Sequence, residues 1–279
     1  MCGRYASAKD PDALVEEFEV EESFVDKPLH ADYNVAPTKR VYAVVSRQPE
    51  GAPEDAAAER QLRVVRWGLV PSWAKDPSIG SRMINARAET VAEKPAFRRA
   101  FGKRRCLLPA DGYYEWYTPT GDDVPLTSRG KPVKQPFYIH RSDGQSLAMA
   151  GLYEWWHDKT REREDPEAWL LTATIITTSA IDTIGRIHDR MPVVIAERDW
   201  QQWLDPTVAE RTVVEQLMVP AQDSELSAYP VSIRVNSVRN NGPELLDPLP
   251  LEEAAPGSVG ADGLWPPPSH KNPAMRTEP

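Results

Sequence analysis

The sequence predicts a strand-dominated α+β domain in which short helices flank the strands. Its 279 residues are 41% hydrophobic and include nine Trp and nine Tyr, which is enough apolar material for a substantial buried core. Most of the apolar runs are short, rich in β-branched and aromatic residues, and bounded by Gly, Pro or Asp, as β-strands are. Stretches with helical spacing are few and short. The length permits two domains, but one domain is the simpler expectation.

The strand predictions fall on separate runs along the chain. They cover residues 41–46, 62–67, 113–117, 136–140, 147–153, 169–177 and 192–195. Between them, residues 48–60 and 118–134 are rich in polar residues, Pro or Gly and lack an apolar period, so we expect surface loops there. Residues 157–167 are expected to form a charged connector.

The clearest helix prediction covers residues 10–19. Asp10 stands in the N-cap position and Pro11 in the first helical position, ahead of an amphipathic pattern. Further helical patterns occur near residues 93–101, 180–187 and 197–204. The last of these holds Trp200 and Trp203 three residues apart, and we expect both rings in the core rather than at a cofactor.

The overall charge is acidic, but basic residues gather in one segment. A net charge of −9 argues at face value against a nucleic-acid partner, because phosphate binding depends on Lys and Arg. Residues 94–105 nevertheless contain six basic side chains and no acid. Such a run forms either a solvated helix face or a surface for a phosphate backbone.

Several classes of protein are excluded by what the sequence lacks. It has neither a transmembrane stretch nor a signal-peptide pattern, so we expect a cytoplasmic protein without a membrane partner. Cys2 and Cys106 lie far apart and have no nearby Cys or His at ligand spacing, so neither a disulfide framework nor a metal site is expected. Without a phosphate-binding Gly-rich loop, no cofactor is expected either. Cys106 lies in an apolar run and should be a small buried hydrophobe.

Cys2 follows the initiator methionine and is the candidate nucleophile. Cysteine is small enough for removal of Met1 to be expected, which would leave an α-amine and a thiol on one residue. Their ordinary pKa values are about 7.7–8.0 and about 8.5, so both groups would be partly nucleophilic at neutral pH. With an aldehyde, this 1,2-aminothiol can form an imine and close it to a five-membered thiazolidine. Position alone, however, favours an inert cysteine.

Polar or aromatic motifs recur after Cys2, and each has a structural explanation when taken alone. Asn34 or Asn85 can cap a turn, Glu115 can be a solvated strand residue, and His188 can be an ordinary surface histidine. The motifs lie at residues 33–38 (Tyr-Asn-Val-Ala-Pro-Thr), 67–73 (Trp-Gly-Leu-Val-Pro-Ser-Trp), 85–90 (Asn-Ala-Arg-Ala-Glu-Thr), 109–116 (Pro-Ala-Asp-Gly-Tyr-Tyr-Glu-Trp) and 187–192 (Ile-His-Asp-Arg-Met-Pro).

In this order, behind Met-Cys-Gly-Arg at the start of the chain, the motifs resemble the SRAP family, the SOS-response-associated peptidase domain. The resemblance covers residues 2–250, including residues 235–244, Val-Asn-Ser-Val-Arg-Asn-Asn-Gly-Pro-Glu. The loops at 48–60 and 118–134 look longer than a minimal family member needs. Residues 251–279, rich in Pro and acidic side chains, are expected to form a disordered tail.

The resemblance implies a single domain of curved antiparallel, barrel-like sheets with flanking helices. It also implies a monomer that binds single-stranded DNA in a basic channel and joins its N-terminal cysteine covalently to abasic sites. The ring-opened abasic sugar carries an aldehyde, which is the electrophile that a 1,2-aminothiol captures. Such a protein would be cytoplasmic, and associated with the nucleoid when bound to DNA.

Carried over by motif, the resemblance assigns catalytic roles to five residues. Cys2 would be the nucleophile, and Asn34 and Asn85 would hold the cysteine and the opened sugar. Glu115 would shuttle protons during ring opening and imine formation, a task suited to a carboxylate with a raised pKa. His188 would act in acid–base steps and in reversing the crosslink.

The resemblance also implies a DNA-binding set. Arg4 and Arg87 would grip flanking phosphates, while Pro37 and Trp73 would wedge or stack against bases beside the lesion, because an aromatic face accepts any base. The basic run at 94–105 becomes a candidate backbone-binding surface, and binding should weaken with salt.

Three other functions remain open from the sequence. A thiol-dependent peptidase acting in trans could use Cys2, Glu115 and His188 as nucleophile and acid–base partners, although an endopeptidase does not need a terminal nucleophile. A noncovalent single-strand binder could rely on Trp73 and the arginines. The imine could also lead to β-elimination and strand cleavage, a route that thiazolidine closure should suppress.

Overall fold

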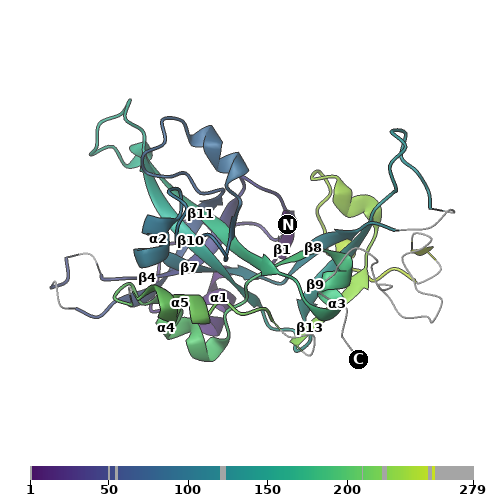
Figure 1. Ribbon diagram of the computed structural model, residues 1–279. Helices are drawn as coiled ribbons and strands as arrows, with labels where there is room; N and C mark the ends of the chain where they lie inside the picture. Colours follow the sequence, from purple (N-terminus) through teal and green to yellow (C-terminus); the bar gives the residue numbers. More distant parts are fainter. Residues whose placement is uncertain are drawn as a thin grey trace.

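Two β-sheets form the body of the molecule in a computed structural model (Figure 1). The structure describes residues 2–254 except 50, 54–55, 120–123, 209, 222–224 and 251–252. The larger sheet contains β2 (Glu22–Ser23), β4 (Arg40–Arg47), β5 (Glu59–Trp67), β6 (Asn85–Arg87), β7 (Arg105–Ala110), β10 (Leu147–His157), β11 (Trp169–Ser179) and β12 (Arg190–Pro192). The smaller contains β1 (Tyr5–Ser7), β3 (Asp32–Val35), β8 (Gly112–Tyr117), β9 (Gln135–Arg141) and β13 (Leu226–Pro230). The expected strand-dominated α+β class is confirmed.

Short helices flank these sheets. The α-helices are α1 (Pro11–Glu17), α2 (Arg98–Lys103), α3 (Asp182–Ile187), α4 (Trp200–Leu204) and α5 (Arg211–Gln216). The 3-10 helices include η1 (Pro77–Arg82), η2 (Pro166–Ala168), η3 (Glu197–Asp199), η5 (Ile233–Asn236) and η6 (Pro243–Leu245). Asp10 caps α1 by accepting a hydrogen bond from the backbone N–H of Ala13, as predicted. Among the described residues, no helix is long and apolar enough to span a bilayer.

The larger sheet closes on itself into a barrel. Its strands β11, β10, β7, β4 and β5 are antiparallel neighbours in that order, and β5 then pairs in parallel with β11 through Arg66 opposite Thr172 and Trp67 opposite Ala173. This ladder leaves no open edge at that point. The expected antiparallel barrel-like sheet is therefore present, with a parallel pairing at its closure.

Successive side chains of the barrel strands point alternately into the barrel and away from it. They therefore form two hydrophobic cores, an inner core inside the barrel and an outer core on its outside. The inner core includes Val41, Ala43, Val45, Val65, Trp67, Cys106, Leu108, Ala110, Met149, Ala173 and Ile175. The outer core lies under α1, α2, α4 and α5, where Phe18 stacks on Trp200 with ring centroids 4.7 Å apart and Trp203 is fully buried. The expected core positions of Cys106, Trp200 and Trp203 are confirmed.

The smaller sheet packs one face against the inner core of the barrel. Tyr113 and Tyr117 of β8 and Phe137 and Ile139 of β9 belong to the same hydrophobic cluster as the barrel interior. The opposite face carries residues such as Tyr114 and is covered by residues around η5. Successive side chains of β8 therefore point alternately toward the inner core and toward the opposite face, and only every second one reaches the barrel.

Several predicted elements differ in their bounds, among them one helix and one strand. The helix expected at 93–101 begins only at Arg98, because Pro95 has no backbone N–H for a helical ladder. The strand expected at 192–195 ends at Pro192: Val193 and Ile195 instead exchange backbone hydrogen bonds with Ala150 and Ala148 of β10. Apart from residues 253–254, the expected tail at 251–279 lies outside the described residues.

The basic run at 94–105 contains one arginine that belongs to the interior. Arg105 is 2% exposed, and its guanidinium donates to the backbone carbonyls of Phe101, Trp203, Asp205 and Val208. It therefore ties α2 and α4 to the start of β7. It does not belong to a phosphate-binding surface.

Replacing Arg105 with Met should destabilise the fold, because the buried carbonyls that it satisfies would lose their donor. We expect a loss of about 2–4 kcal/mol in the free energy of unfolding, measured by urea denaturation. The matched control is Arg99→Met, which changes an exposed arginine of the same run and should cost less than about 0.5 kcal/mol. Equal effects of the two substitutions would contradict this role.

Candidate functional site

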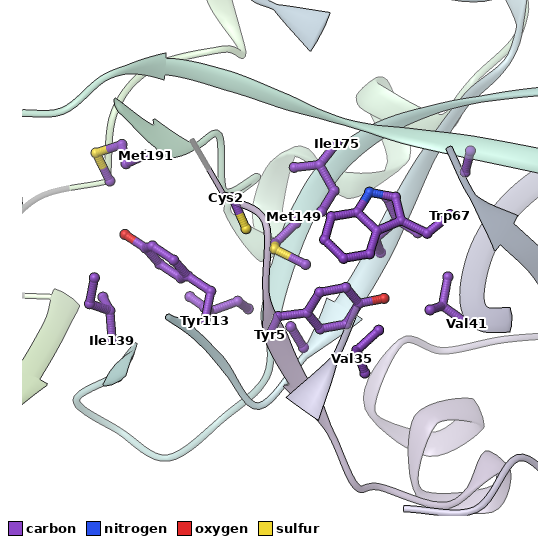
Figure 2. Packing of buried hydrophobic residues seen from close by; sticks show 14 of the residues in the cluster. Cys2, Tyr5, Val35, Val41, Trp67, Tyr113, Ile139, Met149, Ile175 and Met191 are labelled. Carbon is purple, nitrogen blue, oxygen red and sulfur yellow. The ribbon is translucent and has the colours of Figure 1, made fainter. Parts of the chain in front are cut away.

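Cys2 lies in the interior at the junction of the two sheets. It directly precedes β1, which pairs antiparallel with β8 through Tyr5 opposite Tyr113. Figure 2 shows Cys2 among Tyr5, Trp67, Tyr113 and Met149. Its side chain is fully buried. The pairing of β1 with β8 thus brings the start of the chain to the inner core.

Glu115 reaches Cys2 because of its position on β8. Residues two apart on a strand share a face, so Glu115 points to the same side as Tyr113 and Tyr117, toward the inner core. The carboxylate is 2% exposed, and this burial raises the pKa of Glu115 to about 7. Burial, and then the negative charge of Glu115, raise the pKa of the Cys2 thiol well above its ordinary value.

His188 completes the group from the C-terminal cap of α3. Its Nε2 lies 3.9 Å from Oε2 of Glu115. At Nδ1, the backbone N–H of Arg190 is 3.0 Å away and Oδ1 of Asp189 is 2.9 Å away, and these two neighbours require opposite protonation of that nitrogen.

The protonation of His188 is decided by the Arg190 amide. Burial lowers the pKa of His188 to about 4, so the ring is neutral at pH 7. A backbone N–H can only donate, whereas the Asp189 side chain is 80% exposed and is solvated by water. Nδ1 therefore accepts from Arg190, and Nε2 carries the hydrogen toward Glu115.

Asn85 holds the backbone of Cys2. It lies on β6, which pairs in parallel with β11 and sets Asn85 opposite Ile175. Its Nδ2 donates to the carbonyl oxygen of Cys2 at 2.8 Å. Its Oδ1 is buried and, within the described residues, accepts no hydrogen bond. The site therefore contains an acceptor that a bound hydroxyl could satisfy.

Tyr113 is a site residue that the sequence analysis missed. Its hydroxyl is buried and has no hydrogen-bond partner in the described part of the chain. It lies close enough to Glu115 and Cys2 that both charges raise its pKa further after burial has raised it. The available signal was its spacing of two residues from Glu115, which places both side chains on one face of a strand.

Asn34 and Arg4 lie together on the other face of the smaller sheet. Val35 faces the inner core with Cys2, so its neighbour Asn34 points the opposite way. Arg4 Nη1 donates to Asn34 Oδ1 at 2.7 Å and to the carbonyl of Val235 at 3.0 Å. Asn34 Nδ2 contacts the carbonyls of residues 235, 237 and 240. The recorded bonds of Asn34 thus lead to Arg4 and to the 235–240 segment rather than to Cys2.

Three predicted DNA contacts are accessible. Trp73 is 56% exposed, an unusual state for so large an apolar ring. Arg87 is exposed at the end of β6, and Pro37 is partly exposed. The turn after Pro37 is fixed to the end of β5 by the backbone N–H of Thr38, which donates to the carbonyl of Trp67 at 2.8 Å.

The basic run divides into two groups. Arg104 pairs with Glu154 at 2.6 Å, and Arg105 is buried as described above. Its exposed members are Lys94, Arg98, Arg99 and Lys103. A phosphate-binding surface on this run is therefore limited to these four side chains and remains a prediction.

Comparison with known proteins places these features in a family. The family model described as SOS response associated peptidase (SRAP) matches residues 1–238. The abasic site processing protein YoqW of Bacillus subtilis is 37% identical over 248 residues, covering 88% of this chain and 99% of its own. The abasic site processing protein YedK of Escherichia coli is 31% identical, covering 89% and 100%. The abasic site processing protein HMCES of Gallus gallus is 32% identical, covering 82% and 69%.

The architecture also occurs in solved structures. A protein from Bacteroides thetaiotaomicron superposes with a TM-score of 0.71 at 24% identity, covering 89% of this chain and 100% of that one. A phage-related protein from Bordetella bronchiseptica gives a TM-score of 0.57 at 28% identity, covering 82% and 94%. With the family model matching most of its length and the two bacterial relatives covered almost completely, the chain belongs to the SOS response associated peptidase (SRAP) family.

Proposed function

We propose that this protein captures abasic sites in single-stranded DNA by forming a thiazolidine between Cys2 and the ring-opened sugar, after removal of Met1. The observation that carries this proposal is the group around Cys2: Asn85 binds its carbonyl oxygen at 2.8 Å, and the buried carboxylate of Glu115 is near enough for its charge to raise the pKa of the thiol. The names of the relatives, which are abasic site processing proteins, agree with this substrate.

The first step is imine formation. Removal of Met1 turns the backbone nitrogen of Cys2 into a primary amine, which attacks the C1′ aldehyde of the opened sugar. A C–N bond forms, the carbonyl oxygen leaves as water, and a C=N bond remains. Glu115, with its pKa raised to about 7, can both deliver a proton to the departing oxygen and accept one from the amine near neutral pH.

The second step is ring closure by the thiol. The expectation that the thiol is partly ionised does not fit its surroundings, since burial and Glu115 hold its pKa well above the ordinary value. The thiol therefore reacts as S–H: sulfur bonds to the imine carbon, and its proton passes by way of the Glu115 carboxylate to the nitrogen. The two steps together release one water and require neither an oxidant nor a reductant.

Asn85 and His188 serve as supporting groups in this mechanism. The unsatisfied Oδ1 of Asn85 can accept a hydroxyl of the opened sugar, while its Nδ2 keeps Cys2 in place. The Nε2–H of the neutral His188 ring faces the Glu115 carboxylate and helps to orient it, while the carboxylate regains its proton from the thiol or from solvent. Run backwards, ring closure passes the proton from the nitrogen by way of Glu115 to the sulfur, the C–S bond breaks, and the crosslink reopens to the imine.

The DNA contacts in this proposal are assigned to side chains that are accessible at the surface. Trp73 offers a face on which an unpaired base can stack, and Arg87 offers an exposed charge for a phosphate. Arg4 is partly exposed, and its guanidinium is held by the buried Asn34 Oδ1 and by the carbonyl of Val235. In this proposal Asn34 is a positioning residue for Arg4.

A peptidase acting in trans is less well supported. A cysteine peptidase uses a thiolate, and here the environment favours the neutral thiol because burial and Glu115 raise its pKa. No observation within the described residues favours this alternative over aldehyde capture.

Replacing Cys2 with Ser should abolish the covalent product while keeping the amine. The wild type should give a shifted band with abasic single-stranded DNA on denaturing gels, and C2S should give nicked DNA instead, because its imine closes only to a readily hydrolysed oxazolidine and so undergoes β-elimination. Cys106→Ala, which removes the other buried thiol, should crosslink like the wild type. If C2S crosslinks as well as wild type, or if wild type binds without any covalent product, the proposal is wrong.

Replacing Glu115 with Gln should slow crosslinking by about 10²–10⁴-fold at pH 7, because proton transfer is lost. The rate is measured from the gel band over time. The control Glu167→Gln changes a carboxylate that is 81% exposed and should leave the rate unchanged. A rate for E115Q within about twofold of wild type would remove Glu115 from the mechanism.

Although E115Q should slow crosslinking, it should raise the free energy of unfolding relative to wild type as the pH approaches 7. Measuring both quantities therefore distinguishes a loss of chemistry from a loss of folding. Because folding raises the Glu115 pKa from 4.5 to about 7, its contribution to stability is fully present below pH 4.5 and is lost as pH rises to about 7. This amounts to about 3 kcal/mol. Urea unfolding should show wild type falling relative to E115Q across that window, and a constant difference would contradict the raised pKa.

A further inference from the structure

The barrel end remote from Cys2 holds a hollow with a cationic and aromatic lining. We propose that it binds a nucleotide, with the phosphate held by Arg47, Arg63 and Arg104 and the base stacked on Trp155. The hollow measures about 1240 Å³, which is ample for a mononucleotide. On β10, Tyr153 of the hollow lies four residues beyond Met149, which packs beside Cys2 (Figure 2), a separation of about 13 Å at the rise of a strand. This is therefore a second site.

Strand register brings these charges together. On β4, the side chains that face the barrel interior are at odd positions from Val41 to Val45, and the same alternation points Arg47 to the inner side. On β5 the inward positions of Val65 and Trp67 continue to Arg63. Side chains that point into a small barrel are ordinarily apolar. Arg47 and Arg63 point inward and are charged, so they depart from this pattern.

The remaining strands supply the other lining residues. Counting back from Cys106, the inward position before β7 is Arg104, and on β10 the inward positions after Met149 lead to Tyr153 and Trp155. All of these residues line the hollow. Inward-facing cationic or aromatic side chains from β5, β4, the residue before β7 and β10, which are adjacent in the barrel, therefore line the hollow.

The hollow is positive within an acidic protein. Its lining contains Arg47, Arg63, Lys103 and Arg104 against one acidic residue, Asp205, whereas the chain carries −9 overall. Burial raises the pKa of Tyr153, and the positive charges of Arg47, Arg104 and Arg63 oppose that rise, so these charges gather near its hydroxyl. Such a concentration of guanidinium groups is suited to a phosphate.

Several polar groups of the hollow lack protein partners. The Nε of Arg104 is buried without an acceptor in the described part of the chain, although its Nη2 pairs with Glu154. The Tyr153 hydroxyl and the exposed Arg47 side chain form no hydrogen bond with another described residue. A bound phosphate would supply the acceptor that Arg104 Nε lacks, and it could also accept from the other two groups.

Aromatic rings define the place of the base. Arg63 lies over the ring of Phe24 with 3.9 Å between its guanidinium carbon and the ring centroid, which fixes that arginine beside the hollow. Trp155 is partly exposed, lines the hollow and forms a T-shaped contact with Trp169, with centroids 6.5 Å apart. Its ring can stack on a planar partner in the hollow, and stacking of this kind does not depend on base identity.

The test uses calorimetric titration of the full chain at low salt with deoxyadenosine monophosphate, inorganic phosphate and deoxyadenosine. We expect the nucleotide to bind more tightly than either fragment. Arg47→Glu should weaken nucleotide binding by about tenfold or more, and Trp155→Leu should reduce the advantage of the nucleotide over phosphate. Arg40→Glu, an exposed arginine at the other end of β4, is the matched control and should bind like wild type.

Two outcomes overturn the proposal: no heat of binding at millimolar nucleotide, or equal affinity in wild type and R47E. At saturating abasic DNA, R47E should crosslink at the same maximal rate as wild type, because the hollow lies away from Cys2. A competition separates two sources of the nucleotide. If intact single-stranded DNA displaces the mononucleotide from a Cys2→Ala variant, the hollow binds part of the strand. If it does not, the hollow binds free nucleotides, and either result supports a phosphate site.

Discussion

The pairing of β11 with two successive strands is the constraint on which the site depends. β11 closes the barrel against the end of β5 and, a few residues further along, pairs with β6. Between β5 and β6 the chain makes an excursion that begins at Gly68 and passes back close to it at Gly80. A Cβ at Gly68 would lie 2.5 Å from the carbonyl oxygen of Gly80. This close approach lets β6 follow β5 in the parallel pairing with β11. Asn85 is thereby set beside Cys2, while β1 brings Cys2 in from the opposite sheet.

The barrel also explains why one buried environment produces two opposite protonation states. Taking ionisable groups out of water disfavours their charged forms, so Glu115 keeps its proton to about pH 7 and His188 loses its proton above about pH 4. The thiol of Cys2 stays neutral for the same reason. Near neutral pH, Glu115 can therefore give and accept a proton while the thiol keeps its own. This arrangement suits the condensation of an amine, an aldehyde and a thiol, and it does not suit a free thiolate.

Much of the fold follows from sequence pattern, and the rest depends on distant partners. The long strands β4, β5, β10 and β11 carry apolar runs that identify them, and Asp10 and Pro11 mark α1. β1, β3 and β6 are too short and polar to be identified from composition, since their strand character comes from pairing. The order of the motifs identified the family, which the comparisons confirm, but pattern alone could not show that Asn34 bonds to Arg4 or that Arg105 is internal.

The most direct test of the central claim is the mass of the N-terminal tryptic peptide after reaction with abasic single-stranded DNA. Cleavage after Arg4 should release Cys2-Gly3-Arg4 without Met1, carrying the sugar fragment less one water, and the adduct should persist without borohydride treatment because a thiazolidine has no C=N bond to reduce. An adduct on a peptide that keeps Met1, on a lysine side chain, or one that survives only after reduction would contradict the account.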